Sequence, residues 1–383
     1  MIKTLVAQTA EVDDMELAVS EVLEQLDIEC NLRKNSVGIM TCYLDFMENG
    51  IMKAICERLP FDVVGINVLN SATSKGEGPI ALSLAVLTSD DVFFSAGISA
   101  SLARECKDPL KELYERTVAK HQDKPSLIMA FAPSARDSVA GDYLADALCD
   151  ASGGVPVFGM MPSDFTTDLR NPLIIFNGET YKDSMAVILM SGNIRPRFTR
   201  MAISEEQTLK RKAIITSSEG NILKEVNGLP AFDYIKSVGL VEDGKLMMTQ
   251  IIPLMVYLDD GAEPVARHIY ALTPEGWPVL GGLAPEGCSI GISVLSPSDV
   301  VGMVSKTLES QGEFDFLLIA SCISRNFILG MDNMAEIELV QSYLGEGSPF
   351  LFAYVAGELC PVQTADGKFI NRFHNLTLIS CAL

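Results

Sequence analysis

The sequence has few basic residues and no long apolar stretch. Lys and Arg number 29 against 50 Asp and Glu, for a formal net charge of -21. Such an acidic surface repels phosphate backbones and anionic membranes, which argues against nucleic acid or a lipid surface as a partner. The apolar runs are too short to span a bilayer, so we expect no membrane insertion. The N-terminal residues turn acidic at Glu11, which leaves no core for a signal peptide.

Histidine is also scarce, and the cysteines follow no metal-binding pattern. The chain has three histidines and nine cysteines, with no C-x-x-C pair among them. It has no Walker loop and no convincing G-x-G-x-x-G motif for a nucleotide. An odd number of cysteines without framework spacing is typical of a reducing compartment. We therefore expect a cytoplasmic protein without a metal or other cofactor.

One layout occurs three times along the chain. An apolar run is followed by an amphipathic segment, then by a second apolar run that proline introduces, then by another strand-like stretch. The three copies begin at Ser36, Ser126 and Phe314. Their helix candidates span residues 47–59, about 137–152 and 333–344. The repetition predicts an α/β fold of duplicated β-α-β-β units, with mixed sheets flanked by helices.

The length of 383 residues predicts two domains. The segment between Arg195 and Gly228 is the best candidate for the boundary, because a short charged stretch and an Asn-Gly turn follow an apolar run there. We therefore divide the chain into residues 1–205 and 206–383. No long linker separates the halves, so the two domains should pack closely.

Three motifs within the last 70 residues carry a family resemblance. They are Ser321-Cys-Ile-Ser-Arg-Asn326, the Gly357-Glu358 pair that ends a strand, and His374-Asn375 on the closing strand. In this order they resemble the C-terminal domain of the FIST family, and the earlier part of the chain is similar in layout to the FIST N-terminal domain. The resemblance implies an intracellular sensory protein that binds a small ligand, such as an amino acid or small carboxylate. No segment remains for an output domain, so a separate kinase or receptor would receive the signal.

The motifs supply the candidate ligand-binding residues. They are Cys322, Arg325, Gly357, Glu358, His374 and Asn375. Arg325 suits a carboxylate, and Glu358 suits an ammonium group, so together they would fit a zwitterion. Each residue also has a structural alternative: Arg325 could pair with a helix acid, Cys322 could be a small buried residue, and His374 could tie two segments together.

Two further functions stay open. An enzyme could use Cys322 or Ser289 as its nucleophile, since Gly287-Cys-Ser-Ile-Gly291 satisfies G-x-S-x-G. A nucleophile elbow requires a strand before the serine and a helix directly after it, and here a turn precedes Ser289 and a strand-like run follows. The resemblance therefore favours a ligand-binding protein over an enzyme. A protein-interaction scaffold with a vestigial pocket is the other alternative.

Overall fold

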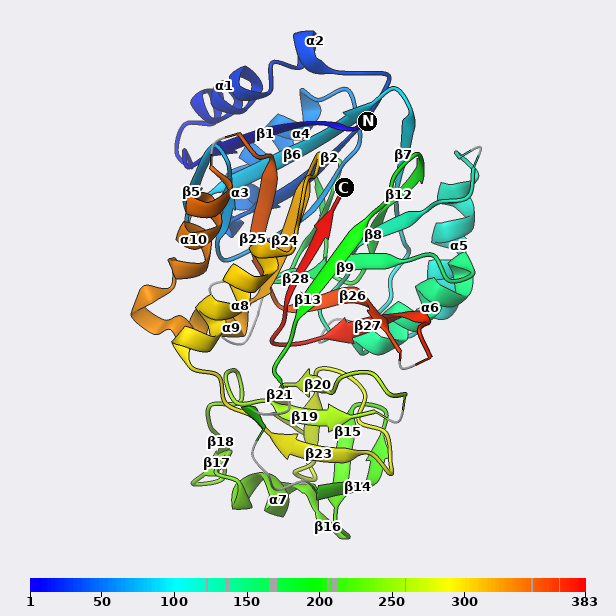
Figure 1. Ribbon diagram of the computed structural model, residues 1–383, viewed down its shortest axis with the longest axis vertical. Coiled ribbons are helices and arrows are strands. Elements are labelled where there is room, and N and C mark those ends of the chain that lie inside the picture. Colours follow the sequence, from blue (N-terminus) through cyan, green and yellow to red (C-terminus); the bar gives the residue numbers. More distant parts are fainter. Residues whose placement is uncertain are drawn as a thin grey trace.

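The fold consists of three similar α/β units and one small β domain (Figure 1). The computed structural model describes residues 1–121, 123–135, 138–164, 171–204, 207–208, 213–258, 260–345, 347–364 and 366–383. Among these residues, no helix combines the length and the apolar character needed to cross a membrane.

Each unit runs strand, helix, strand, helix, strand, hairpin, strand. The first unit contains β1 (Lys3–Thr9), α1 (Met15–Leu26), α2 (Ile28–Asn31), β2 (Asn35–Cys42), α3 (Leu44–Glu48), α4 (Ile51–Glu57), β3 (Val63–Asn67), β4 (Ser71–Thr73), β5 (Gly76–Gly78) and β6 (Leu82–Ser89). The second contains β7 (Val92–Ile98), α5 (Lys107–Val118), β8 (Leu127–Phe131), α6 (Gly141–Ser152), β9 (Val157–Met161), β10 (Ile174–Phe176), β11 (Glu179–Tyr181) and β12 (Ala186–Gly192). The third contains β13 (Arg197–Met201), α8 (Pro297–Glu309), β24 (Leu317–Cys322), α9 (Ile323–Leu329), α10 (Ala335–Leu344), β25 (Phe350–Val355), β26 (Gly357–Gln363), β27 (Phe369–His374) and β28 (Leu378–Ala382).

The small domain is inserted into the third unit, between β13 and α8. It contains β14 (Ala213–Glu219), β15 (Ile222–Val226), β16 (Leu229–Pro230), α7 (Ala231–Ser237), β17 (Val241–Glu242), β18 (Lys245–Leu246), β19 (Leu254–Tyr257), β20 (Val265–Arg267), β21 (Ile269–Leu272), β22 (Pro278–Leu280) and β23 (Ser289–Ile292). Most of these strands form an antiparallel sheet, which Figure 1 shows below the three units.

The three units build their sheets in the same strand order. Four strands of each unit lie as β1-β6-β2-β3, β7-β12-β8-β9 and β13-β28-β24-β25. In each set the last pair is parallel and the other neighbours are antiparallel. The parallel pair follows from the helix between its two strands, which crosses over one face of the sheet. The predicted duplication of the unit is confirmed, and the structure adds an initial strand and helix to each copy.

Each sheet is completed by a hairpin from another unit. The parallel edge strand β3 pairs with β10 of the second unit, β9 with β26 of the third, and β25 with β4 of the first. The exchange therefore runs once around all three units and returns to the first. A free strand edge exposes unpaired backbone groups, and the borrowed hairpin covers that edge.

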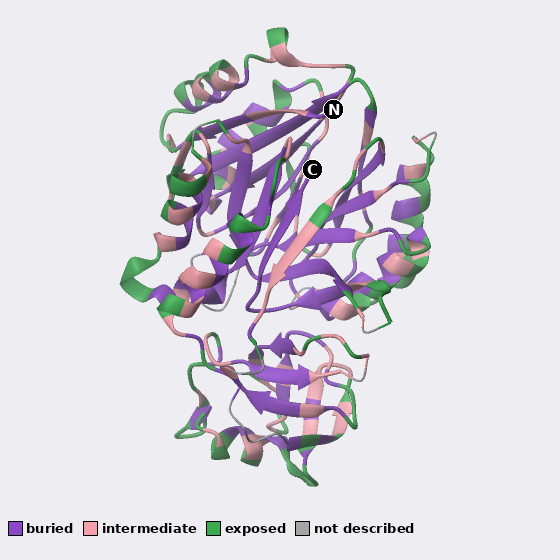
Figure 2. Cartoon of the chain, in the orientation of Figure 1, coloured by how far each residue is buried: buried purple, intermediate pink, exposed green. Residues whose placement is uncertain are grey.

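The core lies between the sheets, and the helices cover their outer faces. Inward residues of all three units, such as Ile39, Met129 and Leu318, form one central apolar cluster. Separate clusters under α1 and α4, under α5 and α6, and under α8 and α10 fill the outer layers. Figure 2 shows most strands of the three units buried and the outer sides of the helices exposed, as amphipathic helices on an α/β sheet require.

Local sequence signals fix the ends of two helices, one in the third unit and one in the second. α8 begins with a capping box, in which Ser296 Oγ accepts from the Asp299 amide and the Asp299 carboxylate accepts from the Ser296 amide. α6 ends at Gly153, which adopts a left-handed conformation. The predicted start of this helix near Asp137 lies outside the described residues, and α6 begins at Gly141.

The proposed division at residues 205 and 206 separates sequence segments that share one sheet. β13 precedes this division, yet it pairs with β28 at the other end of the chain. The charged stretch at residues 209–212 lies outside the described residues. The division therefore remains a proposal about sequence domains. In space, the compact bodies are the three-unit core and the small domain.

The parallel pair of β2 and β3 leaves no room for a side chain at Gly65. A Cβ on Gly65 in β3 would lie 1.9 Å from the Met40 carbonyl oxygen of β2. We expect Gly65→Ala to lower the free energy of unfolding by about 2 kcal/mol through overpacking. Gly302→Ala in α8 is the matched control, because a Cβ there meets no atom within 4 Å. It should stabilise the protein by about 1 kcal/mol. Urea denaturation measures both, and equal effects would contradict this account of Gly65.

Candidate functional site

The predicted site residues gather where the third unit meets the small domain. Cys322 ends β24, and its Cα pairs with that of Val355 at the end of the parallel strand β25. Gly357 begins β26 just after this point, and Glu358 stands opposite His374 in the β26–β27 pair. The carboxyl ends of two parallel strands and one hairpin thus bring distant segments together, as open α/β sheets do at their ligand sites.

The glycine of the Gly-Glu pair is required by packing. A Cβ on Gly357 would lie 2.7 Å from Cε2 of Phe373 and 3.0 Å from Sδ of Met161. Only glycine lets β26 approach both side chains this closely. The close approach places the next residue, Glu358, beneath the β27–β28 turn.

Glu358 is a fully buried carboxyl group with one free oxygen. Its Oε2 accepts hydrogen bonds from Thr377 Oγ1 at 2.7 Å and from the Thr377 amide at 3.3 Å. Its Oε1 is buried and has no hydrogen-bond partner among the described residues. Burial raises the pKa of Glu358 to about 8, so the group is mostly protonated at neutral pH.

Asn375 lies in the turn between β27 and β28 and has no partner for its side chain. Both its Oδ1 and its Nδ2 are buried without a hydrogen bond among the described residues. The next residue, Leu376, has a φ of 57°, a left-handed conformation that is costly for leucine. The bond from the Cys322 amide to the Thr377 carbonyl (3.0 Å) and the burial of Leu376 hold this turn in place.

His268 from the small domain completes the cluster. Its Nδ1 lies 3.0 Å from the Thr249 carbonyl oxygen, which can only accept, so this nitrogen carries the proton. Its Nε2 then faces Ser324 Oγ at 3.1 Å and Cys322 Sγ at 4.0 Å. Burial lowers the pKa of His268 to about 4, so the ring is neutral.

The sequence argument did not select His268 or Ser324 as site residues. Their contact joins positions 56 residues apart in two different domains. The only local signal was a histidine in a probable strand, which does not reveal a partner in another domain.

Cys322 is a protonated thiol in this environment. Burial first, and then the neighbouring Glu358, raise the pKa of its thiol well above the usual value. A thiolate is therefore disfavoured here.

Arg325 is held within the third unit. Its Nη2 pairs with Glu336 Oε1 at 2.7 Å and donates to the Val300 carbonyl oxygen at 3.0 Å. Its Nε donates to Ser321 Oγ at 3.0 Å, and both ends of the ion pair are fully buried. The guanidinium thus joins α9 to α10 and α8. A ligand contact by Arg325, as the sequence predicts, would require this pair to open.

The side chain of His374 bonds within its own hairpin, and Ser289 lies in the sheet of the small domain. His374 Nε2 lies 3.4 Å from the Cys360 carbonyl oxygen within its own hairpin. Burial, followed by Arg200, Arg267 and Arg372, lowers its pKa well below the usual value. Ser289 begins β23 in the small sheet, and α8 starts only after Ser296. The strand after Ser289 was predicted, and it does not provide a nucleophile elbow.

Three ion pairs connect the core to the small domain around this site. They are Arg267–Asp142, Arg372–Asp260 and Arg200–Glu263.

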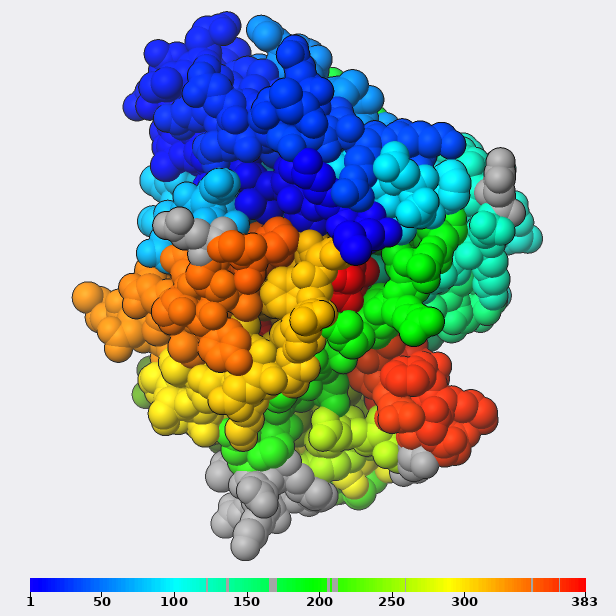
Figure 3. Space-filling model, turned by 45° about the horizontal axis from the view of Figure 1, so that its top comes forward, coloured from blue at the N-terminus to red at the C-terminus, as the bar shows by residue number. Residues whose placement is uncertain are grey.

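In Figure 3, the green region that includes β13 lies between the yellow and orange helices of the third unit and the red β26–β27 hairpin.

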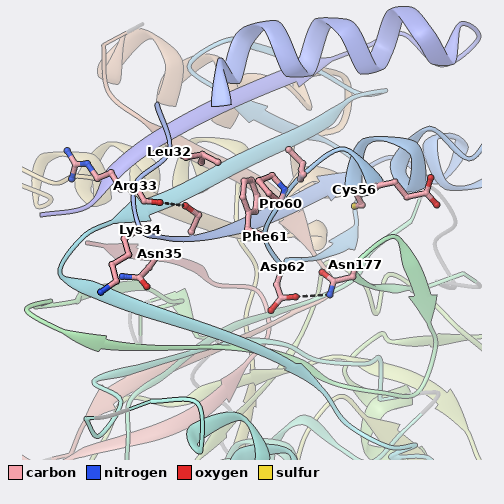
Figure 4. Close-up of a pocket in the computed structure, with 12 residues that line it drawn as sticks. Leu32, Arg33, Lys34, Asn35, Cys56, Pro60, Phe61, Asp62 and Asn177 are labelled. Carbon is pink, nitrogen blue, oxygen red and sulfur yellow. Dashed lines mark hydrogen bonds between the residues drawn. The ribbon is translucent and has the colours of Figure 1, made fainter. Parts of the chain in front are cut away.

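A separate surface depression lies at the first sheet, beside the amino ends of β2 and β3. Figure 4 shows this open depression of about 780 Å³ beside Arg33, Pro60 and Phe61, where Asn177 Nδ2 donates to Asp62 Oδ1 at 2.8 Å. It borders the amino ends of β2 and β3, whereas ligands of open sheets bind at carboxyl ends. Within the described ranges, no group of three His, Cys, Asp or Glu residues is arranged to hold a metal ion.

Comparison with known proteins identifies the family. The chain matches the FIST N domain over residues 36–229 and the FIST C domain over residues 231–361. It therefore belongs to the FIST family, whose domains are generally sensory and ligand-binding.

Other comparisons add little. No curated protein shows significant similarity to the chain. Among the solved structures that match, cyanuric acid hydrolase from A. caulinodans is similar at a TM-score of 0.28 and 10% identity, over 67% of this chain and 80% of that chain. A score this low supports no conclusion about function.

The buried Glu358 makes stability depend on pH. Its pKa is about 8 in the folded state against 4.5 normally, so the folded state holds the proton longer. Stability from this group is therefore lost as pH rises from 4.5 towards 8, at about 1.4 kcal/mol per pH unit. Glu358→Gln should remove this loss between pH 6.5 and 8, and His268 contributes equally to both curves. Chemical denaturation across this range measures it, with the exposed Glu309→Gln as control. If the free energy of unfolding of Glu358→Gln falls with pH as steeply as that of wild type, the raised pKa of Glu358 is contradicted.

The Arg325–Glu336 pair should be structural. Arg325→Ala leaves the buried Glu336 carboxylate without its counter-charge, although Ser321 Oγ still donates to its Oε2. We expect a loss of about 4 kcal/mol in the free energy of unfolding. Replacing both residues by methionine should restore most of this loss, because no buried charge remains. If Arg325→Ala costs less than about 1 kcal/mol, the range of an exposed pair, the pair is not needed for folding.

Proposed function

We propose that this protein is a cytoplasmic sensor whose small ligand binds at the Glu358–Asn375 cluster. The observation that carries the proposal is that three buried polar atoms, Glu358 Oε1 and both amide atoms of Asn375, have no hydrogen-bond partner among the described residues. Buried polar groups are nearly always hydrogen-bonded, and leaving them unpaired is costly. A bound ligand would supply the missing partners.

The atoms define the chemistry that this ligand offers. Glu358 would accept from an ammonium group, and Asn375 Nδ2 would donate to a carboxylate while its Oδ1 accepts. This pattern fits an amino acid, and a small carboxylate with a hydroxyl group fits it less completely. Gly357 positions Glu358, and Cys322 lines the same end of β24. Arg325 would act indirectly, by fixing α9 through Glu336.

The signal would pass through the small domain. His268 reaches from that domain to Ser324, and Gly281 lies so close to Asn375 that a Cβ there would be 2.6 Å from Oδ1. A ligand held at Asn375 would favour the position of the small domain seen here. A ligand can shift such an equilibrium only through its different affinity for the two arrangements. A separate kinase or receptor would then detect the position.

The cysteines support a cytoplasmic location. All nine are free thiols, and most are buried. Disulfides are rare in the reducing cytoplasm, where buried thiols act as small apolar residues.

A catalytic role for Cys322 is the second candidate, because His268 Nε2 lies 4.0 Å from its sulfur. This histidine nitrogen is unprotonated and could accept the thiol proton. The raised pKa of Cys322 opposes this role in the structure as it stands.

Ligand binding at the cluster should be accompanied by proton release. An ammonium group beside Glu358 favours its charged form, so binding at pH 7 lowers its pKa and releases a proton. Calorimetry of an amino-acid panel in two buffers of different ionisation enthalpy measures this release. Glu358→Gln should abolish proton release, and Asn375→Ala should weaken binding about tenfold.

The exposed Asn193→Ala serves as the control and should bind as wild type does. If no amino acid or hydroxy acid binds, or if both cluster variants bind as wild type does, the sensor proposal fails at this site. Turnover that Cys322→Ala abolishes would favour the enzyme instead. Stable co-purification with a kinase, unchanged in Asn375→Ala, would favour the scaffold.

A further inference from the structure

A second cavity lies against β27. Its walls come from α6, from β27 and from three segments of the small domain, and its volume is about 300 Å³. This volume suits a small organic molecule. The cavity is distinct from the Glu358–Asn375 cluster, because neither of those residues lines it.

Arg372 brings an unused hydrogen-bond donor to this cavity. Its Nη2 forms an ion pair with Asp260 of the small domain. Its Nη1 is buried and has no partner among the described residues, while the side chain is only 7% exposed. Burying a charged nitrogen costs hydration, and this cost is normally offset by a hydrogen bond, which Nη1 lacks.

The other charged pair on the wall is already satisfied. Arg267 Nη2 binds Asp142 Oδ1 at 2.8 Å, and its Nη1 donates to the Phe373 carbonyl oxygen at 3.2 Å. Asp142 Oδ2 accepts from the Leu283 amide at 2.8 Å. Arg372 is therefore the cation on this wall with a donor to spare.

The remaining walls restrict the ligand. Ala145, Leu258, Leu283 and Ile370 provide apolar surface for an apolar body. Asp146 lies on the same wall, and burial followed by nearby Asp142 and Asp150 raises its pKa. Arg372 also interacts with this carboxyl group, so an anion bound at Arg372 lies near Asp146. The repulsion is stronger for a dianion such as phosphate than for a single carboxylate.

We propose that this cavity is a binding site for a small monocarboxylate with an apolar body, held by Nη1 of Arg372. The ligand carboxylate accepts from Nη1 while Nη2 keeps Asp260. The bound molecule then contacts α6, β27 and the small domain together, and so stabilises the closed arrangement of the two bodies. This site is independent of the ligand proposed for Glu358 and Asn375.

Benzoate is the probe for this site, with benzamide as its uncharged analogue. Calorimetric titration of the full chain should show saturable benzoate binding at millimolar concentration and none for benzamide. Inorganic phosphate should bind more weakly than benzoate. Arg372→Met should weaken benzoate binding at least about tenfold, as expected for loss of a charge-assisted bond, and Arg372→Lys should weaken it less.

Two variants separate a binding role from a folding role of Arg372. Cys149→Met narrows the cavity from α6 without changing either arginine, and it should also weaken benzoate binding. Asp260→Ala removes the ion pair but leaves Arg372, so it should bind benzoate at least as tightly as wild type. Glu358→Gln should leave benzoate binding unchanged, which distinguishes this site from the first. The proposal is overturned if benzoate shows no saturable binding or if benzamide binds as tightly as benzoate. It is also overturned if Arg372→Met and Cys149→Met both bind benzoate as tightly as wild type does.

Discussion

The whole structure depends on the backbone pairing between each parallel edge strand and a hairpin borrowed from another unit. Without β10, β26 and β4, the strands β3, β9 and β25 would each expose an unpaired edge. Because the exchange is circular, removing any one hairpin opens a sheet in a different unit. The central apolar cluster is shared by all three sheets, so the units are expected to fold together rather than singly.

The candidate site arises where this near-symmetry is broken. Cys42 and Phe131 are the last paired residues of β2 and β8 in their parallel pairs, the position that Cys322 occupies in the third unit. The hairpins of the first two units have strands of three residues, whereas β26 and β27 have seven and six. The longer hairpin carries Glu358 and leads into the turn with Asn375, and only the third unit carries the inserted domain. The asymmetric additions, and not the repeated framework, therefore supply the polar groups.

The sequence predicts the repeated framework well because its signals are local. Buried strands such as β8 and β24 are continuous apolar runs, and the helices between them keep a helical period of apolar residues. The hairpin exchange is not predictable in this way, since Ile174 to Phe176 reads as a short apolar stretch with no mark of its partner β3. Each hairpin finds its partner strand only when all three units come together, because the exchange closes in a circle.

The same contrast holds for the site. The Gly-Glu pair and the His-Asn turn were found from short motifs, and the structure places Glu358 in β26 and Asn375 just after its partner strand β27. Arg325 was chosen for its place after a strand, but its guanidinium turns to Glu336, eleven residues further on, across the break at Gly330. No sequence period places α10 over α9 after such a break. His268 was missed for a related reason, since only domain packing brings it to Ser324.

The contacts between the core and the small domain would let the proposed site report its occupancy. An apolar cluster around Met255 and Leu376 joins the two bodies, but the three ion pairs of Arg200, Arg267 and Arg372 cross the same junction. The three arginines are largely buried, whereas Glu263 is 70% exposed. Buried charges are tolerated only when paired in good geometry, and on separation they regain hydration. An interface built this way fixes one orientation strongly without a large net gain in stability. Small contributions from a ligand can therefore shift its equilibrium, whereas a wholly apolar interface of the same size would remain closed.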